Sequence, residues 1–343
     1  MRSLTGILDK KVFIIAEIGN NHNGSKETAL ELIDFASKAG ADAVKFQTFT
    51  GLDIVSPTVS ADEYKGWDVK GFTFWHEFLD TISLGLSDHK EVYEYASLKG
   101  LIPFSTPTSV RIVDFLESIG NEIYKIASMD VTNIPLLKRV AETGKPVIMS
   151  TGMANETEIE QAINIFKNNE LVVLHCVSDY PVQPENVNLL SIPFLAERFN
   201  VITGFSDHSL TNEFAIAAIS IGARVIEKHI TYSRQSKEKA EHHFALEPGE
   251  FKEMVNAIRN IESGMGTKKL MRSAGELENK VKYRRSLHLN KNKKTGEQIF
   301  ADDISVVRPA IGADASEFDF FIGKTLGRDV DAWTGLKRED MNP

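Results

Sequence analysis

The chain has 343 residues, of which 42% are apolar and 25% charged. This composition is typical of a folded globular protein and excludes a disordered, collagen-like or coiled-coil chain. The 39 basic residues against 48 acidic ones leave a net charge of −9, which argues against binding to nucleic acid or to an anionic membrane surface. The lone Cys176 excludes an intrachain disulfide, and no stretch is apolar enough to span a membrane. We therefore expect a cytoplasmic protein of about two domains.

Short apolar runs rich in valine and isoleucine alternate with longer segments of helical periodicity along most of the chain. Leu32, Phe35 and Ala36, for example, recur at the i, i+3, i+4 spacing of an amphipathic helix. Eight strands that each precede a helix predict an α/β fold of the (β/α)8 TIM-barrel class. The expected strands are Val12–Ile18, Ala43–Phe46, Leu101–Phe104, Glu122–Ile126, Pro146–Met149, Leu171–Cys176, Val201–Phe205 and Arg224–Ile230.

A doubly wound open sheet is the rival of the barrel. The segment Glu17–Gly24 after the first strand fits neither the G-x-G-x-x-G nor the Walker pattern of such sheets, so the barrel is favoured. The long segment Thr50–Leu86 between the second and third strands is aromatic and turn-rich. We interpret it as an insertion near the active face, because long loops of this kind are commonly functional.

The alternation of strands and helices ends near Ser263. We predict a barrel domain over residues 1–265, a charged linker over 266–284 and a small β-rich domain over 285–343. The strands expected in the small domain are Ser286–Leu289, Ile304–Val307 and Thr325–Val330.

Polar side chains stand at the end of nearly every expected barrel strand. In a (β/α)8 barrel these ends meet on one face, where active sites lie. Lys45 and Lys125, together with hydroxyl groups on neighbouring strands, predict a site for phosphate or carboxylate. Either lysine could instead form a structural ion pair, or a Schiff base as in aldolases. The rim residues are Glu17, Lys45, Gln47, Ser105, Thr106, Lys125, Ser128, Ser150, Thr151, Ser178, Tyr180, Ser206, Asp207, His208, Glu227 and His229.

Two histidines, His208 and His229, lie one strand–helix unit apart, at the ends of the seventh and eighth strands. We expect their side chains close together over the barrel mouth, as an open metal site requires. With Asp207 and Glu227 as nearby oxygen donors, the pair favours Mg²⁺ or Mn²⁺ over structural zinc. Considered alone, a histidine is more often a hydrogen-bonded core residue than a metal ligand. Cys176, in mid-strand, is expected to be an inert core thiol.

Eight motifs in this order resemble those of the sialic acid synthase family, which includes legionaminic and pseudaminic acid synthases. Three segments of the tail, RSL at 285–287, GE at 296–297 and VRP at 307–309, resemble the antifreeze-like (SAF) module of these enzymes. The barrel motifs are IAEIGNNHNG at 15–24, VKFQT at 44–48, FSTP at 104–107, YKIAS at 124–128, STGM at 150–153, HC at 175–176 with YP at 180–181, GFSDH at 204–208 and IEKH at 226–229.

The resemblance implies a transferase that condenses phosphoenolpyruvate (PEP) with an open-chain N-acyl hexosamine, giving a nine-carbon 2-keto acid and phosphate. It implies that Lys45 and Lys125 hold the phosphate and carboxylate of PEP with the help of several hydroxyl groups. The other implied contacts are Thr106, Ser128, Ser150 and Ser206 to PEP, and Gln47, Ser178, Tyr180 and Glu241 to the sugar.

The resemblance also implies which side chains take part in the chemistry. Glu17 would orient the sugar or take a proton, and Glu227 would position water or PEP. A divalent Mn²⁺ or Mg²⁺ ion on His208 and His229 would act as a Lewis acid on the sugar aldehyde. The implied catalytic set is Glu17, Lys45, Lys125, His208, Glu227 and His229.

In this family the SAF module of one subunit covers the barrel mouth of the other. The resemblance therefore implies a domain-swapped homodimer in which Arg308 reaches the sugar in its partner's site. Without the resemblance, Arg308 would be interpreted as a surface arginine that precedes a proline.

Three departures from the family pattern concern the sugar. Asp130 stands where many members have glutamate, and Ser178 stands where sialic acid synthases often carry asparagine and relatives acting on diacetamido sugars often carry serine. Lys239–His242 replaces a Gly-Pro-Asp segment with a sugar-binding aspartate, and Glu241 keeps the charge on a longer side chain. The identity of the hexosamine, and whether it is phosphorylated, therefore stay open. The alternatives are a pseudaminic or legionaminic acid synthase, a Schiff-base aldolase on the same barrel, and a binding protein without turnover.

Overall fold

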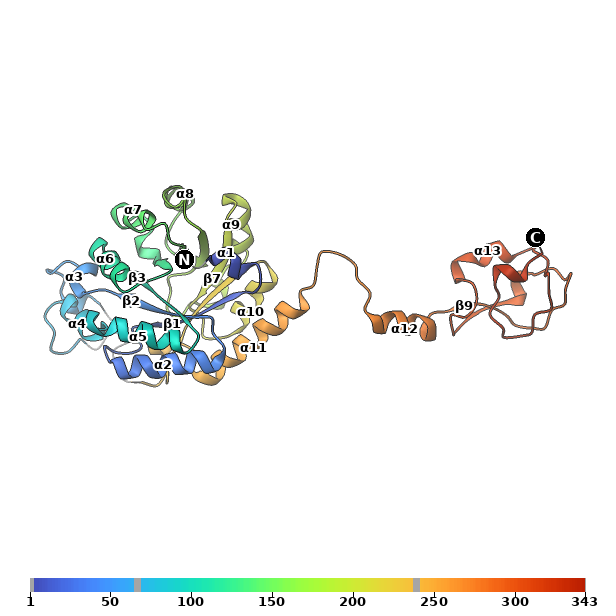
Figure 1. The fold of residues 1–343 in the computed structure, drawn as a ribbon, viewed down its shortest axis with the longest axis horizontal. Coiled ribbons are helices and arrows are strands. Elements are labelled where there is room, and N and C mark those ends of the chain that lie inside the picture. The colour runs from blue at the N-terminus through green and yellow to red at the C-terminus, as the bar shows by residue number, and fades with distance from the viewer. Residues whose placement is uncertain (1–2, 65–68, 237–240, 343) are drawn as a thin grey trace. The chain divides into compact units, whose positions relative to one another are not determined.

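A computed structural model describes residues 3–64, 69–236 and 241–342 and divides the chain into two compact units, Met1–Gly266 and Thr267–Pro343. In the first unit, eight parallel strands form a closed barrel in chain order, and helices surround the strands (Figure 1). The predicted (β/α)8 TIM barrel is thereby confirmed. The strands are β1 (Phe13–Gly19), β2 (Ala43–Thr48), β3 (Ile102–Pro107), β4 (Tyr124–Ile126), β5 (Val147–Ser150), β6 (Leu171–Cys176), β7 (Ile202–Asp207) and β8 (Val225–His229).

Strand pairing extends further toward the C-terminal rim than the apolar runs indicate. In the ladder Glu17 pairs with Lys45 and with His229, and Gln47 pairs with Thr106. β2, β3 and β7 run two or three residues beyond their expected ends, because the polar residues there still form ladder hydrogen bonds. The closed ladder thus fixes the backbone of the polar rim.

The helices follow the sequence pattern closely, and α2 (Lys26–Ala39) illustrates why. The side chain of Ser25 accepts a hydrogen bond from the backbone of Thr28, and Gly40 ends the helix with a positive φ of 88°. The other barrel helices are α5 (Leu86–Leu98), α6 (Val110–Ser118), α7 (Ile134–Glu142), α8 (Glu156–Ile165), α9 (Ser191–Phe199), α10 (Glu213–Ser220) and α11 (Pro248–Gly264).

A short helix that the sequence pattern does not predict, α1 (Leu4–Leu8), precedes the barrel. Its Leu4 and Leu8 belong to the same buried cluster as Phe13 and Ile148 of the barrel strands. A larger cluster fills the layer between the strands and the surrounding helices. The barrel is therefore packed on both faces of its sheet, as a parallel sheet requires.

The insertion after β2 contains α3 (Gly51–Ile54), a 3-10 turn η1 (Ala61–Glu63) and α4 (Trp75–Ile82). Trp75 and Phe78 stack, with ring centroids 4.7 Å apart, inside a small apolar cluster of this segment. The aromatic residues of the insertion thus form a local core.

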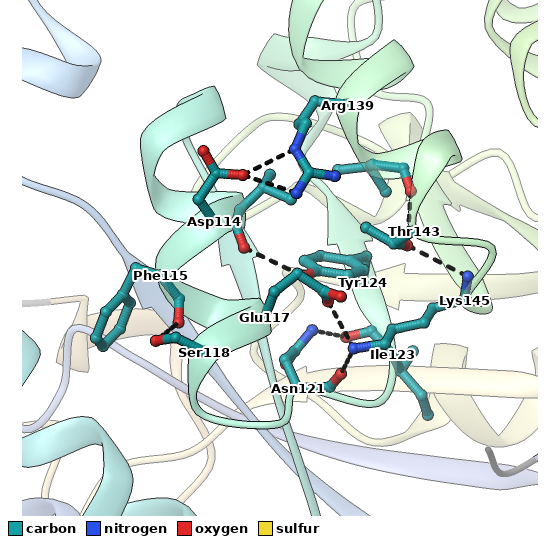
Figure 2. A network of polar contacts seen from close by, with 12 residues as sticks. Asp114, Phe115, Glu117, Ser118, Asn121, Ile123, Tyr124, Arg139, Thr143 and Lys145 are labelled. Carbon is teal, nitrogen blue, oxygen red and sulfur yellow. Dashed lines mark hydrogen bonds and ion pairs between the residues drawn. The ribbon is translucent and has the colours of Figure 1, made fainter.

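A polar network joins α6, β4 and α7 where β4 begins (Figure 2). The hydroxyl of Tyr124 donates to the carboxylate of Glu117 over 2.6 Å, and Lys145 donates to the same oxygen and to the carbonyl of Asn121, each over 2.6 Å. Because these residues lie at the N-terminal ends of β4 and β5, opposite the catalytic rim, we assign the network to stability.

The second unit has its own apolar core, which includes Leu287, Leu289 and Phe321. β9 (Ser286–Leu289) and β10 (Ile304–Val307) pair antiparallel, as two of the three expected strands. The prediction of a third strand over Thr325–Val330 is wrong, since these residues form only isolated bridges to separate segments and no continuous ladder. The helices described in the second unit are α12 (Ala274–Tyr283) and α13 (Phe318–Phe321). In the described residues of both units, the remaining 3-10 turns are η2 (Ser128–Asp130), η3 (Pro184–Asn186), η4 (His242–Phe244), η5 (Ala301–Asp303), η6 (Ala315–Glu317) and η7 (Arg338–Asp340).

Among the helices that the structure describes, none has both the length and the apolar character needed to cross a membrane.

Candidate active site

A cavity of about 340 Å³ opens at the C-terminal ends of the barrel strands, and every strand contributes at least one side chain to its wall. Of the predicted rim residues, Ser105, Thr151 and Asp207 do not line this cavity. The structure brings together around it all the barrel residues that were predicted to bind substrate or metal or to take part in catalysis. They are Glu17, Lys45, Gln47, Thr106, Lys125, Ser128, Ser150, Ser178, Tyr180, Ser206, His208, Glu227, His229 and Glu241.

On one side of the cavity, Lys45 forms an ion pair with Glu17, with Nζ 2.9 Å from a carboxylate oxygen. Lys45 also donates to the Thr106 hydroxyl over 2.8 Å, and Gln47 Nε2 donates to the other Glu17 oxygen over 3.2 Å. Burial raises the pKa of Glu17 to about 7, although Lys45 opposes the change. Burial acts to lower the pKa of Lys45, but the carboxylates of Glu17 and Glu227 outweigh it and the pKa is raised.

From β4, Lys125 donates to the Ser150 hydroxyl over 2.6 Å and lies 3.9 Å from the Glu227 carboxylate. Ser206 donates to the same Glu227 oxygen over 2.8 Å. Burial lowers the pKa of Lys125. For Glu227 burial acts in the raising direction, but the cations Lys125 and Lys45 outweigh it and lower the pKa. The two buried carboxyls, Glu17 and Glu227, thus have pKa values pushed apart, which is the pattern of an acid and a base in one site.

The rings of His208 and His229 lie side by side, with centroids 5.5 Å apart. His208 Nδ1 hydrogen-bonds the Val177 carbonyl over 2.9 Å, which directs its other ring nitrogen away from that carbonyl. His229 Nδ1 lies 3.5 Å from a Glu241 carboxylate oxygen, and within the described part of the chain both atoms are buried without a hydrogen-bond partner. Such orphaned polar atoms are what a divalent ion or bound water would satisfy.

Burial and the neighbouring His208 hold the pKa of His229 well below its usual value. Burial acts in the same direction on His208, but the contact with Cys176 outweighs it and raises the pKa. Groups of three or more His, Cys, Asp or Glu residues arranged for a metal do not occur in residues 3–64, 69–236 and 241–342. Any ion on the histidine pair would therefore complete its shell with water or substrate oxygens.

The prediction that Asp207 is an oxygen donor near the two histidines is wrong. It points out of the barrel, where its carboxylate pairs with Lys228 over 2.7 Å, and both side chains are fully buried. The reason is strand alternation, because Ser206 and Glu227 face the cavity and their neighbours Asp207 and Lys228 face outward.

Cys176 is buried, as expected, but its side chain also lines the cavity, and its inertness stays a prediction. The Ser128 hydroxyl donates to its sulfur over 3.6 Å. Burial acts to raise the pKa of Cys176, but contacts with His208, Ser128 and Lys125 outweigh it and lower the pKa. A side chain at Gly152 would meet the Ser178 hydroxyl at 2.3 Å, so only glycine lets this serine approach.

Arg308 belongs to the second unit, where its guanidinium lies 5.5 Å from the centroid of the Tyr283 ring. Its contact with the sugar stays a prediction. In the segment that departs from the family pattern, Lys239 and Ala240 lie outside the described residues. Glu241 lines the cavity, and His242 is buried against the Thr231 hydroxyl over 2.7 Å.

Sequence reasoning missed an apolar part of the cavity wall, which includes Ile54, Met129 and Met153. Their residue types are ordinary for cores and loops. Only the position of Met129 and Met153, each three residues after a strand end, could have suggested this place, whereas Ile54 ends the short helix α3. Asn20 is buried and donates to Gln47 Oε1 over 3.1 Å.

The model of the NeuB family matches residues 32–270. The chain is 38% identical to the pseudaminic acid synthase of Campylobacter jejuni over 97% of both chains. It is 37% identical to the N,N'-diacetyllegionaminic acid synthase of Legionella pneumophila over 96% of this chain and 94% of that protein. The crystal structure of N-acetylneuraminic acid synthetase from Leptospira borgpetersenii superimposes with a TM-score of 0.69 and 34% identity, covering 79% of this chain and 90% of that chain. The family match over most of the barrel and the full-length relatives show that this chain belongs to the NeuB family.

Proposed function

We propose that the protein condenses PEP with an open-chain N-acyl hexosamine to give a nine-carbon 2-keto acid and phosphate. The observation that carries the proposal is a pair of buried lysines, Lys45 on β2 and Lys125 on β4, that line one cavity together with two histidines. The substrate is N-acetylmannosamine or a related acetamido sugar. The names of the relatives, pseudaminic acid synthase and N,N'-diacetyllegionaminic acid synthase, favour a diacetamido hexose.

The cavity suits PEP because its two anionic ends require separate cationic partners. Lys125 with Ser150 would hold one end, and Lys45 with Thr106 the other. Ser128 and Ser206 supply further hydroxyl donors between them. Gln47, Ser178, Tyr180 and Glu241 remain for the hydroxyl and acylamino groups of the sugar.

In the proposed reaction, the electron pair of the PEP double bond forms a carbon–carbon bond to the sugar aldehyde, and the aldehyde oxygen takes a proton. Water then adds to C2 of PEP and loses a proton. Finally the bond between C2 and the phosphate oxygen breaks while the C2 hydroxyl passes its proton to the departing phosphate, which leaves the 2-keto acid. Glu17, whose pKa of about 7 lets it exist in both forms near neutral pH, is placed to move the proton of the sugar. Glu227, kept ionised, would orient the water.

His208 and His229 would hold a divalent Mn²⁺ or Mg²⁺ ion. The fit of these residues rests on the adjacent rings and on the orphaned His229 Nδ1 and Glu241 oxygen. When bound, the ion supplies a Lewis acid for the sugar aldehyde. The role of the protein is to keep the two imidazoles side by side, with Phe244 packed against His229 at a centroid distance of 4.8 Å.

We also propose that residues 285–343 form an SAF module that covers the barrel mouth of a second copy, so that the active form is a homodimer. Support comes from the apolar residues Met129 and Met153, which line the cavity and are 52% and 74% exposed. Exposed apolar rims of this kind are typical of interaction sites. Arg308 would then contact the sugar in its partner's cavity. The cytoplasmic location expected from the sequence stays a prediction.

A mixing experiment tests the shared site. Arg308→Ala and Lys125→Ala should each be inactive or strongly impaired, and a mixture that exchanges subunits should recover part of the activity. Recovery follows because one of the sites in a mixed dimer combines an intact barrel with an intact module. Two variants that stay inactive after proven subunit exchange would contradict the swapped dimer.

A Schiff-base aldolase is the second candidate, because burial lowers the pKa of Lys125 and so favours the neutral amine that attacks a carbonyl. Borohydride would trap a pyruvate adduct on Lys125 in an aldolase, and mass spectrometry would detect the added mass. The proposed condensation gives no such adduct.

The deciding experiment measures phosphate release with PEP, a divalent ion and one sugar at a time. The sugars are N-acetylmannosamine, its 6-phosphate and the diacetamido hexoses, and mass spectrometry identifies the product. We expect release only when all three components are present. Release from PEP alone, or an unchanged rate after chelation of the ion, would overturn the proposal.

A further inference from the structure

Asn20 lies in the loop after β1 and is not among the described residues that line the cavity. Its Nδ2 atom donates to Gln47 Oε1 over 3.1 Å, and Gln47 Nε2 donates to Glu17 Oε1 over 3.2 Å. Asn20 and Glu17 are 5% and 1% exposed. A directed chain of two hydrogen bonds therefore runs from the loop to a carboxylate in the cavity.

The donor-to-acceptor direction of these two hydrogen bonds depends on the orientation of the Gln47 amide. An amide has an oxygen that only accepts and a nitrogen that only donates, and the two ends have nearly the same shape. Asn20 presents a donor to Gln47, so the oxygen of Gln47 turns toward Asn20 and its nitrogen toward Glu17. Turned the other way, Gln47 would place its oxygen against a carboxylate oxygen, and a buried donor and acceptor would lose their partners.

A second carboxylate strengthens this requirement. The Cβ position of Gly19, whose φ is +53°, is 3.1 Å from Glu17 Oε1 and 3.2 Å from both Gln47 Nε2 and Glu241 Oε2. These three polar atoms therefore gather around Gly19, whose lack of a side chain leaves them room. A reversed amide would bring a third oxygen into this cluster without a hydrogen to hold it.

The backbone of the loop is held independently of the Asn20 side chain. The Asn20 carbonyl accepts from the backbone of Asn23 over 2.8 Å, and the backbone of Asn21 donates to the Ile18 carbonyl over 2.9 Å. The Asn21 side chain donates to the Ile230 carbonyl over 2.8 Å. Substitution of Asn20 should therefore change the orientation of Gln47 and leave the loop in place.

We propose that Asn20 is a positioning residue for sugar binding, which acts by fixing the orientation of the Gln47 amide between Glu17 and Glu241. The inference rests on the proposed function, in which Gln47 contacts the sugar. Because PEP is held by the lysines and hydroxyls, loss of this orientation should weaken use of the sugar far more than use of PEP.

The test compares Asn20→Ala, Asn20→Asp and a control in steady-state kinetics with each substrate varied in turn. In Asn20→Ala the oxygen of Gln47 loses its donor, so the amide is held at one end only, and we expect kcat/KM for the sugar to fall about tenfold with the KM for PEP changed less than about twofold. Asn20→Asp keeps the shape but only accepts, so it should hold Gln47 reversed and reduce kcat/KM for the sugar further.

Asn169→Asp is the matched control. Asn169 donates from Nδ2 to the carbonyls of Ala141 and Lys145, away from the cavity. Asn169→Asp therefore removes the same kind of donor and adds the same charge as Asn20→Asp. It should lower the thermal unfolding temperature and leave both substrates unaffected. The second readout is a double-mutant cycle, in which Asn20→Ala should have less than about a twofold effect in the Gln47→Ala background.

Three results would overturn the inference. One is unchanged sugar kinetics in folded Asn20 variants, and another is an equal loss with and without Gln47. The third is failure of both variants to fold, as judged by circular dichroism, because Asn20 would then be required for the loop itself. If the unaltered enzyme releases no phosphate with any sugar, the proposed function fails instead, so the two failures are distinguishable.

Discussion

Glu17 on β1 lies directly opposite Lys45 on β2 in the barrel ladder, and their side chains form a buried ion pair of 2.9 Å at the cavity wall. Buried charges persist only when they are paired. An anion that enters the cavity must therefore compete with Glu17 for the Lys45 amine. The strength with which the protein binds PEP is thus coupled to the charge of one carboxyl.

Substitution of Glu17 tests this competition. Glu17→Gln keeps the shape and a hydrogen-bonding oxygen but removes the negative charge, so Lys45 becomes free for the substrate. We expect PEP to bind at least as tightly as to the unaltered protein, while turnover falls at least about 100-fold through loss of the proton-transfer group. Titration calorimetry with PEP and a phosphate-release assay measure the two effects. Weaker PEP binding in this variant would contradict the competition.

The histidine pair makes a separate prediction. His208→Ala or His229→Ala removes one of the two imidazoles that would hold the divalent ion, so bound Mn²⁺ should be lost and phosphate release abolished. Electron paramagnetic resonance counts free Mn²⁺ directly and so reports binding without turnover. Circular dichroism serves as the control for folding. Full Mn²⁺ binding in both variants would show that the ion site lies elsewhere.

The pair of Lys228 and Asp207 behind the rim makes a prediction about stability. Lys228 Nζ contacts Asp207 and also the carbonyls of Ser209 and Thr211, at 2.6 and 3.0 Å. Lys228→Met leaves the Asp207 charge buried without its partner, and we expect the free energy of unfolding to fall by about 3–5 kcal/mol. Urea unfolding measures it.

The double variant Lys228→Met with Asp207→Asn is the control for this stability effect. It removes the orphaned charge, so it should recover part of the loss that Lys228→Met alone causes. If the double variant is less stable than Lys228→Met, the cost comes from lost packing and not from the unpaired carboxylate.

The barrel and the position of its active face could be predicted from the sequence because both follow from local patterns. The alternation of apolar runs and amphipathic segments predicts the strands and helices, and a closed parallel barrel brings residues as distant in the chain as Glu17 and Glu241 to one rim. His208 and His229 are predictable as neighbours for the same reason, because they end adjacent strands of the barrel.

The local pattern does not determine what depends on the orientation of neighbouring side chains. Asp207 is expected near the histidines, yet the alternation of β7 turns it outward to Lys228. Cys176 is expected in the core, although it faces the cavity. Gly152 makes room for Ser178, and this contact between the ends of β5 and β6 has no counterpart in local periodicity. In the second unit, Thr325–Val330 has the composition of a strand but finds no continuous partner.

The second unit provides the pH prediction. The carboxylate of Asp303 is buried and forms ion pairs with Lys291 and Lys293, at 2.5 and 2.6 Å. Burial acts to raise the pKa of Asp303, but these partners outweigh it and lower the pKa to about 2. The pKa of the folded state is thus below that of the unfolded state. The stabilisation is therefore fully present above about pH 4 and is lost as the pH falls through about 2.

Asp303→Asn removes this dependence. Because Lys291 is largely exposed to solvent, we expect Asp303→Asn to lower the opening free energy of this unit by only about 1–2 kcal/mol at pH 6. The difference between the variant and the unaltered protein should shrink as the pH falls from 4 toward 2. Hydrogen exchange of the β9 amides in the full chain measures the local opening free energy of this unit. Asp302→Asn, at the exposed neighbouring residue, is the control and should change little at any pH. A difference for Asp303→Asn that stays constant from pH 6 to pH 2 would mean that its hydrogen bonds, and not its charge, stabilise the unit.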